Sequence, residues 1–426
     1  MPRSLPTVRF SLVCLAAASV AFGVAIIGLA KLLLLLCALL VLLYRWLRRD
    51  ESTTLLQGAM SPTILLALAC LAAGALWSTG SADEALQALV KHGKLILIPA
   101  VLILLRSRRE ALIALACFAG AQVFLLASTW LHFAGVPIAW ITSKEVGTCA
   151  TCSYAIFATY LDQSIMTAVL AAVVWHGRSY LPGRYRTLLA PAVALLALGC
   201  VFLIFQARTA YLIAIALVAL TIVWELPRRL QPAAALILLT LVAALVATSG
   251  QVRQRLLEVD TSLQSSNQSS ALSTSTGTRI HLWLGSLHLI ESSPLHGTGT
   301  GSWKKEFNQL GRAGSDQAAA RGAADKVYPN PHQEFLLWGV ELGIPGIALL
   351  CAVLFALYRD SLQLEMPARR AMQSVLAALT LACLFNCILY DALIGDFFCI
   401  TLALVAALRA KPTPPEPSTT QTLPSI

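Results

Sequence analysis

His332 is the residue whose type and position point most directly to chemistry, in the segment YPNPHQEFLLWGVELGIPG. Asn330 is a good helix N-cap, Pro331 suits the first helical position, and Gln333 completes an Asn-x-x-Gln capping box. His332 would then lie in the first helical turn, where the positive end of the helix dipole disfavours imidazolium. A neutral imidazole there is available as a general base. The alternative is a histidine that only hydrogen-bonds a loop.

Two isolated arginines have side chains suited to phosphate oxygens. Arg208 interrupts two apolar runs in QARTAYL, and burying it in a membrane is costly unless an anion meets it. The alternative is that it extends to the lipid headgroups. Arg279 opens the segment 278–291, where an amphipathic helix is predicted, and alone it would be a solvated charge. The apolar positions of that helix are Ile280, Trp283, Leu287 and Ile290.

Lys91 and Lys94 lie inside an apolar run, three residues apart, and therefore share one face of a helix. Two ammonium groups inside a membrane need a negative partner or a water-filled cavity, and a lipid phosphate is a natural partner. If residues 83–93 instead lie flat on the membrane, both lysines are interfacial.

Several other polar residues are candidates because of their position. Asp391 and Asp396 flank a short turn in LYDALIGDFF, and Asp162 with Gln163 begins an apolar run expected on the same side. Aspartates at helix ends are often caps. Glu341 lies deeper in the helix expected after YPNPHQ, where it is protonated or paired with a basic group.

Other motifs are excluded by their spacing. GTGTGSW lacks the Lys-Ser/Thr of a phosphate-binding loop, and the chain has no His-Glu-x-x-His and no Asp-x-Asp. We therefore expect no metal, no cofactor and no nucleotide-sugar donor. Cys149 and Cys152 lie in a loop, where a local disulfide is favoured. The net charge of +10 comes in small basic clusters between apolar runs, so no nucleic-acid partner is predicted.

The composition indicates a membrane protein. Of 426 residues, 58% are hydrophobic and 12% charged, and the mean hydropathy is +0.74. A bilayer core needs about 20 apolar residues per helix. We predict an all-α polytopic fold of about twelve spans without a cleaved signal peptide, the first two hinged near Gly23–Gly28, with Lys31 close to an interface. The predicted spans are 10–28, 29–44, 60–78, 84–105, 110–131, 161–177, 187–205, 209–226, 232–249, 333–357, 371–389 and 393–409.

Charge predicts the orientation of these spans. With both ends in the cytoplasm, every basic cluster faces the cytoplasm, and the long loop 250–331 faces outward. The organisation is then spans one to nine in 1–249, the loop 250–331, three spans in 332–409 and a disordered cytoplasmic tail at 410–426. Within the loop, 261–276 is low in complexity, 296–303 is a glycine-rich turn and 304–325 is helical. The clusters are Arg45, Arg48 and Arg49; Arg106, Arg108 and Arg109; Arg178, Arg184 and Arg186; Arg228 and Arg229; and Arg359, Arg369 and Arg370.

Three motifs in this order resemble the O-antigen ligase family of Gram-negative envelopes. RTAYL follows a mid-chain span. TRIHLWLGSLHLIESSPLHGTGTGSW resembles the family's Arg…Trp…Pro-Leu-x-Gly-x-Gly segment, and PHQEFLLWGVELGIPG resembles its His-x-x-x-Leu…Glu-Leu-Gly-x-x-Gly segment. The specific part of the resemblance covers roughly 202–350, and the rest agrees by topology.

The resemblance implies a GT-C-like glycosyltransferase of the bacterial inner membrane whose site faces the periplasm. Such ligases transfer O-antigen polysaccharide from undecaprenyl pyrophosphate to a sugar hydroxyl of lipid A–core, without ATP or metal. In the family, the arginines matching Arg208 and Arg279 and the histidine matching His332 are essential. The aspartate matching Asp391 is implicated, and Lys91 and Lys94 fall where members carry basic residues.

These residue types suit the implied reaction. Convergent Arg and Lys side chains stabilise a departing pyrophosphate. His332 accepts the proton of the attacking hydroxyl or binds the pyrophosphate, and attack opposite the leaving group predicts inversion. The alternatives are an O-antigen polymerase, a protein O-oligosaccharyltransferase and, from another class, a lipid-linked oligosaccharide flippase or transporter. A transporter should carry charges near the midplane and have pseudo-symmetric halves.

Overall fold

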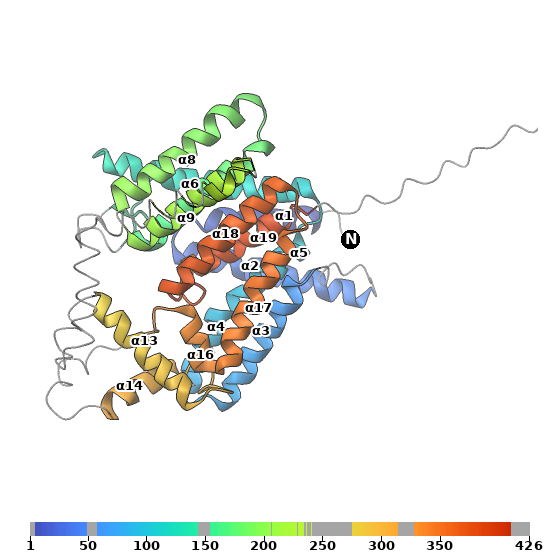
Figure 1. The fold of residues 1–426 in the computed structure, drawn as a ribbon. Helices are drawn as coiled ribbons and strands as arrows, with labels where there is room; N and C mark the ends of the chain where they lie inside the picture. Colours follow the sequence, from blue (N-terminus) through green and yellow to red (C-terminus); the bar gives the residue numbers. More distant parts are fainter. Residues whose placement is uncertain are drawn as a thin grey trace, which may run out of the picture.

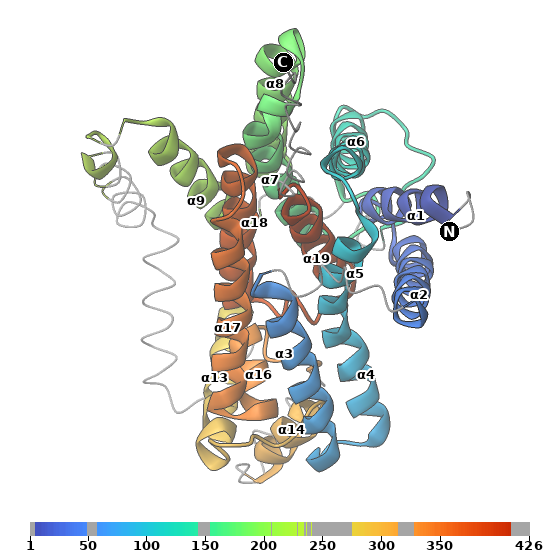
Figure 2. The same ribbon diagram turned by 90° about the vertical axis from the view of Figure 1, so that its right-hand side faces the viewer.

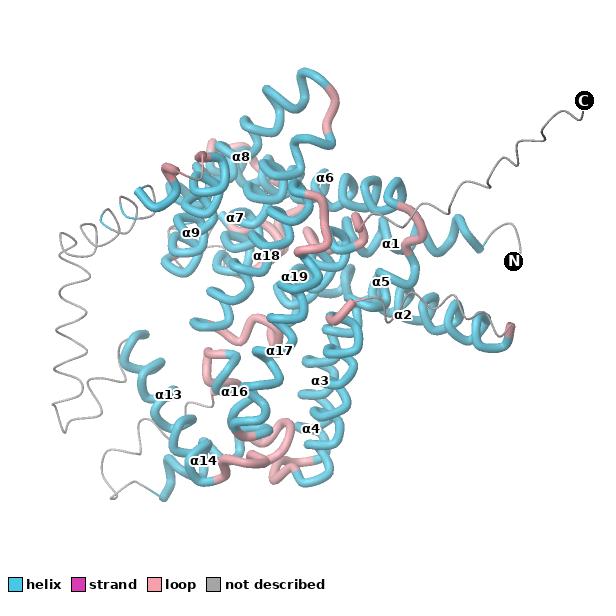
Figure 3. Tube along the Cα trace, turned by 45° about the vertical axis from the view of Figure 1, so that its right-hand side comes forward, coloured by secondary structure: helices cyan, strands magenta, loops and turns pink. Residues whose placement is uncertain are grey.

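The computed structural model describes residues 5–48, 58–143, 154–205, 207–227, 229–233, 236, 240, 275–313 and 328–409. Over these ranges the chain is helical and contains no strand (Figure 3). Eight helical stretches there are long and apolar enough to cross a membrane, and Thr7–Ser19 and Ala392–Ala406 are shorter apolar helices. The prediction of an all-α polytopic membrane protein is confirmed, whereas the count of about twelve spans stays a prediction.

Ten of the twelve spans predicted from the sequence correspond to helices with shifted ends. The stretch 82–104 is one span made of α4, a short 3-10 turn Gly93–Ile96 and α5. The stretch 185–205 is another, with π-helical turns on both sides of α8. The helices are α1 (Leu5–Ser19), α2 (Val24–Leu47), α3 (Met60–Gly74), α4 (Ala82–His92), α5 (Leu97–Leu104), α6 (Arg108–Phe133), α7 (Tyr160–Gly177), α8 (Ala190–Gly199), α9 (Arg208–Glu225), α13 (Ser275–Ser292), α14 (Trp303–Ala313), α16 (Glu334–Leu342), α17 (Ile344–Ser361), α18 (Met366–Phe385) and α19 (Ala392–Ala406).

The core forms around α18 and α19. α18 packs on α7, α9, α17 and α19, and α19 also packs on α5 and α6 (Figure 2). α19 is buried along nearly its whole length, because apolar side chains occupy every face of it. α2 is different: its leucines on one face are exposed, as expected of a helix that borders lipid. These are Leu29, Leu32, Leu36 and Leu39.

The first two helices break earlier than the sequence predicts. α1 ends at Ser19 and α2 begins at Val24, with Gly23 extended as its N-cap. Gly28 lies inside α2, so the predicted hinge at Gly23–Gly28 is wrong at its second glycine, because the apolar run around Gly28 continues the helix. Lys31 is half-buried and forms an ion pair with Asp396 of α19 at 2.7 Å.

The predicted continuous span 333–357 is wrong. Its helix is interrupted at Gly343, whose φ is +73°, and continues as α17 in a new direction. Only glycine adopts this conformation readily. The interruption is fixed from outside, since Ile344 N–H donates to the carbonyl of Pro294 at 2.8 Å.

The amphipathic helix predicted over 278–291 is confirmed as α13, but with a rotated face. Leu287 is 47% exposed. α13 packs on α14 and α16, and all three lie together at one end of the molecule near α3 and α4 (Figures 1 and 2). Its buried side chains are Leu282, Ser286, Leu289 and Ile290.

Charged loops meet at the other end. Arg178 and Arg370 both contact Glu225, at 2.9 and 3.4 Å, so the ends of α7, α9 and α18 converge. Arg108 forms a bidentate pair with Glu365 at 2.5 and 2.6 Å. Members of three predicted basic clusters therefore share one face, although the orientation of that face in the membrane stays a prediction.

Some predictions fall outside the described residues. These are most of the span 232–249, the serine-rich stretch up to residue 274, residues 314–327, the tail 410–426 and the pair Cys149 and Cys152.

Candidate functional site

The glycine-rich turn predicted at 296–303 ends at residue 302, because Trp303 begins α14, and the turn bridges α16 and α3. Thr298 N–H donates to Val340 O at 2.8 Å, and the Thr300 hydroxyl donates to Leu71 O at 2.7 Å. The turn needs glycine where backbones approach closely: at Gly299, with φ +93°, a Cβ would lie 2.2 Å from Ser78 Cα. The turn is therefore a packing element between helices.

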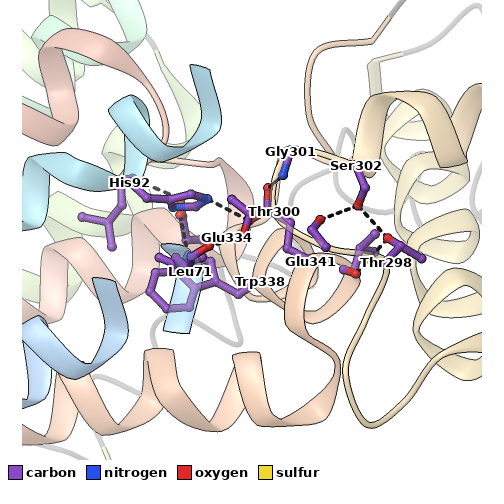
Figure 4. Close-up of polar contacts among 12 residues, drawn as sticks. Leu71, His92, Thr298, Thr300, Gly301, Ser302, Glu334, Trp338 and Glu341 are labelled. Atoms are coloured by element: carbon purple, nitrogen blue, oxygen red, sulfur yellow. Dashed lines mark hydrogen bonds and ion pairs between the residues drawn. The ribbon is translucent and has the colours of Figure 1, made fainter. Parts of the chain in front are cut away.

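Glu341 fixes this turn to α4. Its Oε2 lies 2.9 Å from His92 Nε2, and its Oε1 accepts from the Gly301 N–H at 2.9 Å (Figure 4). The side chains of Glu341 and His92 are fully buried. The sequence left open whether Glu341 is protonated or paired with a basic group, and it did not identify His92 as the partner.

We expect Glu341→Leu to lower the free energy of unfolding by about 3 kcal/mol, since it leaves the His92 ring and the Gly301 N–H without their buried acceptor. Glu341→Gln keeps an amide oxygen for Gly301 and should cost less. Denaturant unfolding in detergent micelles measures both variants. The matched control is Glu291→Leu, at an exposed carboxylate of α13. A Glu341→Leu protein as stable as the control would contradict the prediction.

The turn between α18 and α19, residues 386–391, is held from two sides. Glu334 is fully buried; its Oε2 accepts from Leu389 N–H at 3.0 Å and its Oε1 from Trp338 Nε1 at 3.1 Å. Lys94, 6% exposed, donates through Nζ to three carbonyls of the turn. These are Leu389 O at 3.3 Å, Tyr390 O at 3.0 Å and Asp391 O at 2.6 Å.

Lys91 approaches the same turn. Its ammonium lies 4.1 Å from the centre of the Tyr390 ring. Lys91 and Lys94 thus face the same way, as their spacing predicts. The negative partner of Lys94 in the structure is a group of backbone carbonyls, where the sequence suggested a lipid phosphate.

We expect Lys94→Met to lower the unfolding free energy by about 2 kcal/mol, because charge-assisted hydrogen bonds to buried carbonyls disappear. Lys91→Met is the matched comparison and should cost under about 1 kcal/mol, the value of a partly exposed cation–π contact. Thermal unfolding in detergent ranks the two. The opposite ranking would show that Lys94 does not anchor the turn.

Arg279 and His332 come together beside this turn. Arg279 Nη2 donates to Asn386 Oδ1 at 3.4 Å. Burial and the nearby Arg279 charge both lower the pKa of His332 below its usual 6.5, in that order of size. Burial lowers the pKa of Arg279 too. The site therefore joins a guanidinium and a neutral imidazole drawn from opposite ends of the long loop.

The predicted capping box is wrong. α16 begins at Glu334, and Gln333 is its N-cap, with its side chain accepting from Leu336 N–H at 2.5 Å. Asn330 instead accepts from the backbone N–H of His332 at 2.9 Å. That local bond holds His332 outside the helix with φ +52°, a conformation no other non-glycine residue adopts in the described part of the chain. Burial and Arg279 thus replace the helix end as the cause of its neutrality.

Two further candidates, Arg208 and Gln163, have different surroundings. Arg208 is the first residue of α9 and is exposed, and no hydrogen bond or ion pair joins it to Arg279 or His332 in the described structure. Gln163 is fully buried and binds the Ile156 N–H and the Thr129 hydroxyl. Those contacts give Gln163 a packing role between α6 and α7.

The two aspartates of the α18–α19 region differ. Asp391 occupies the N-cap position of α19 but makes no side-chain cap hydrogen bond. Its carboxyl is half-buried; burial raises its pKa, and the charges of Lys94 and Lys91 oppose that rise. Asp396 is inside α19, not at its end, and is the partner of Lys31.

A cavity of about 220 Å³ adjoins the site between α4 and α14. Both signs of charge line it, and Lys304 lies 3.5 Å from Glu84. No group of three or more His, Cys, Asp or Glu side chains that could hold a metal ion occurs in the described ranges. The lining residues are Glu84, Gln87, Lys91, Gly301, Trp303, Lys304, Pro329, Leu337, Glu341 and Tyr390.

Sequence reasoning missed His92, Glu334 and Asn386. Each is a polar residue in an apolar stretch, so each carried a weak signal: it needed a buried partner. The signal gave no indication of which partner, because the partners lie between 55 and 249 residues away along the chain.

Comparison with known proteins gives a match to a family model. Residues 193–351 match the family model described as O-antigen ligase, close to the segment 202–350 that carries the resemblance. No curated protein matches the sequence. The matched segment contains Arg208, Arg279, His332 and Glu341. It supports a ligase- or polymerase-type activity in lipopolysaccharide-related glycosyl transfer. The match over residues 193–351 is consistent with a member of the O-antigen ligase family.

Proposed function

We propose that the protein transfers O-antigen polysaccharide en bloc from undecaprenyl pyrophosphate to a sugar hydroxyl of lipid A–core. The reaction takes place at the periplasmic face of the bacterial inner membrane and needs neither ATP nor metal. The observation that supports the proposal is that Arg279, which contacts the turn at Asn386, is near enough to His332 for its charge to lower the pKa of that ring, and that both residues lie in the segment matched by the family.

The reaction exchanges a glycosyl phosphate bond for a glycosidic bond. The acceptor oxygen attacks the anomeric carbon of the polysaccharide and forms a new C–O bond. The bond from that carbon to the pyrophosphate oxygen breaks, and undecaprenyl pyrophosphate leaves with the electron pair. The hydroxyl proton passes to the imidazole of His332. Attack opposite the leaving group inverts the configuration of the anomeric carbon.

The lowered pKa of His332 favours its role as base over a role as pyrophosphate ligand. A neutral ring accepts a proton, whereas an anion-binding ring is better charged, and the Arg279 charge disfavours the charged ring. Arg279 instead stabilises negative charge on the departing pyrophosphate. We assign Arg208 and Lys91 to the same pyrophosphate as further cations. Lys94 and Glu334 hold the turn that orients the centre.

A reconstituted reaction tests the proposal. Purified protein in nanodiscs is mixed with undecaprenyl-pyrophosphate-linked polysaccharide and lipid A–core, with a metal chelator and no ATP. Polysaccharide attached to lipid A–core is the expected product. Longer lipid-linked polysaccharide without a modified acceptor would contradict the ligase and indicate a polymerase. No product under conditions in which a known ligase is active would contradict both.

A further inference from the structure

Asn386 is a buried amide whose two polar atoms have different surroundings. It follows α18 directly and is 4% exposed. Its Oδ1 accepts from Arg279 at 3.4 Å, and its Nδ2 is buried with no hydrogen-bond partner among the described residues. A guanidinium only donates, so the Arg279 contact requires the amide oxygen on that side. The amide NH2 therefore lies beside this contact as a donor with no acceptor among the described residues.

The turn that carries Asn386 gives this donor little freedom. Asn386 N–H donates to Ala382 O at 2.9 Å, which fixes the residue to the end of α18. Glu334 accepts a hydrogen bond from the N–H of Leu389, and Lys94 donates to three carbonyls of the same turn. Buried donors in native proteins almost always have an acceptor. An oxygen atom of a bound ligand would supply the acceptor that this oriented donor lacks.

The surroundings indicate the chemistry of that ligand. Arg279 is a cation in contact with Asn386, and its charge helps to keep the His332 ring neutral. A guanidinium and an amide NH2 side by side are suited to oxygens that accept hydrogen bonds and carry negative charge. Phosphoryl oxygens fit both conditions, whereas a sugar hydroxyl is uncharged and also donates.

We propose that Asn386 Nδ2 donates a hydrogen bond to a phosphoryl oxygen of the lipid-linked donor, next to the oxygen bound by Arg279. This inference rests on the proposed function and adds a substrate-contacting residue to it. Asn386 would then act on the pyrophosphate itself and not only by orienting Arg279.

A double-mutant cycle separates these two roles. The probe is undecaprenyl pyrophosphate without sugar, titrated against protein in phosphatidylcholine nanodiscs. Asn386→Ala should weaken binding about 10- to 100-fold, the range for a hydrogen bond to a charged group. The same loss should appear when Asn386→Ala is added to Arg279→Met, which has no cation left to orient. If Asn386 acted only by orienting Arg279, its substitution would weaken binding by the wild-type protein and change nothing in the Arg279→Met protein.

Control variants distinguish the loss of this one contact from unfolding and from failure of the proposed function. Gln122→Ala removes another buried amide with an unpartnered Nε2, in the middle of α6, and should leave binding unchanged. Asn386→Ser replaces Asn386→Ala if the latter unfolds at a lower temperature than the wild type. Wild-type protein that binds no undecaprenyl pyrophosphate would overturn the proposed function, and this inference with it. Tight binding by both Asn386 variants in a functional protein would overturn this inference alone.

Discussion

Substituting His332 with alanine is expected to slow polysaccharide transfer by about 100- to 10,000-fold, the usual contribution of a positioned general base. Folding should be preserved, since the side chain of His332 is half-buried and the local bond at this position is made by its backbone N–H. The rate of formation of modified lipid A–core at saturating donor measures the effect. His288→Ala, at an exposed histidine of α13, is the matched control and should retain the wild-type rate.

The pH dependence tests the role of His332 further. Its pKa lies below 6.5, so the ring stays neutral from neutral pH down to that lowered value. We expect kcat/KM to be level above pH 6.5 and to fall as the pH drops through the lowered pKa, when protonation removes the base. His332→Ala should lack this acid limb. A His332→Ala enzyme with wild-type rate, or with the same acid limb, would remove His332 from the chemistry.

Arg279→Lys is expected to reduce transfer about 100- to 1,000-fold, comparable to the loss of one donor that stabilises developing charge. Lysine retains the positive charge but loses the planar pair of donors that suits phosphate oxygens. Initial rates with undecaprenyl-pyrophosphate-linked polysaccharide measure the loss. Arg184→Lys, at an exposed arginine beside the π-helical turn at 185–189, is the matched control.

Arg279 also affects the acid limb of His332. Arg279→Met removes a charge that lowers the pKa of His332, so the limb should move to higher pH. Arg279→Lys keeps the charge and should leave the limb in place. An identical limb in the wild type and Arg279→Met would show that the two groups are not close enough to interact. A wild-type rate in Arg279→Lys would contradict the proposal that the guanidinium of Arg279 donates two hydrogen bonds to the pyrophosphate.

Much of the fold could be predicted from the sequence, because the apolar runs within the described residues become helical. The interruption at Gly343 could not, although Gly and Pro occur there. It depends on the carbonyl of Pro294, which the chain brings to Ile344 only after α13 packs on α16. The rotated face of α13 has the same cause: its partner helices, not its own periodicity, decide which side is buried.

The sequence predicted the charged and titratable residues of the candidate site, but not the buried residues that hold them in position. Arg279 and His332 could be named from motifs, and the structure brings them together. The roles of Asn386 and Glu334 could not be predicted, because they depend on hydrogen-bond partners distant in the chain. The local structure predicted for His332 was wrong. Asn330 can cap a helix or close a turn, and the sequence does not show which.

Release of undecaprenyl pyrophosphate tests the central claim most directly. Reconstituted protein is given undecaprenyl-pyrophosphate-linked polysaccharide, and the released lipid is measured before and after lipid A–core is added. The proposed chemistry predicts release that begins with the acceptor, equals the modified acceptor mole for mole, and is lost in His332→Ala. Release that does not depend on lipid A–core, or that persists at the wild-type rate in His332→Ala, would contradict it.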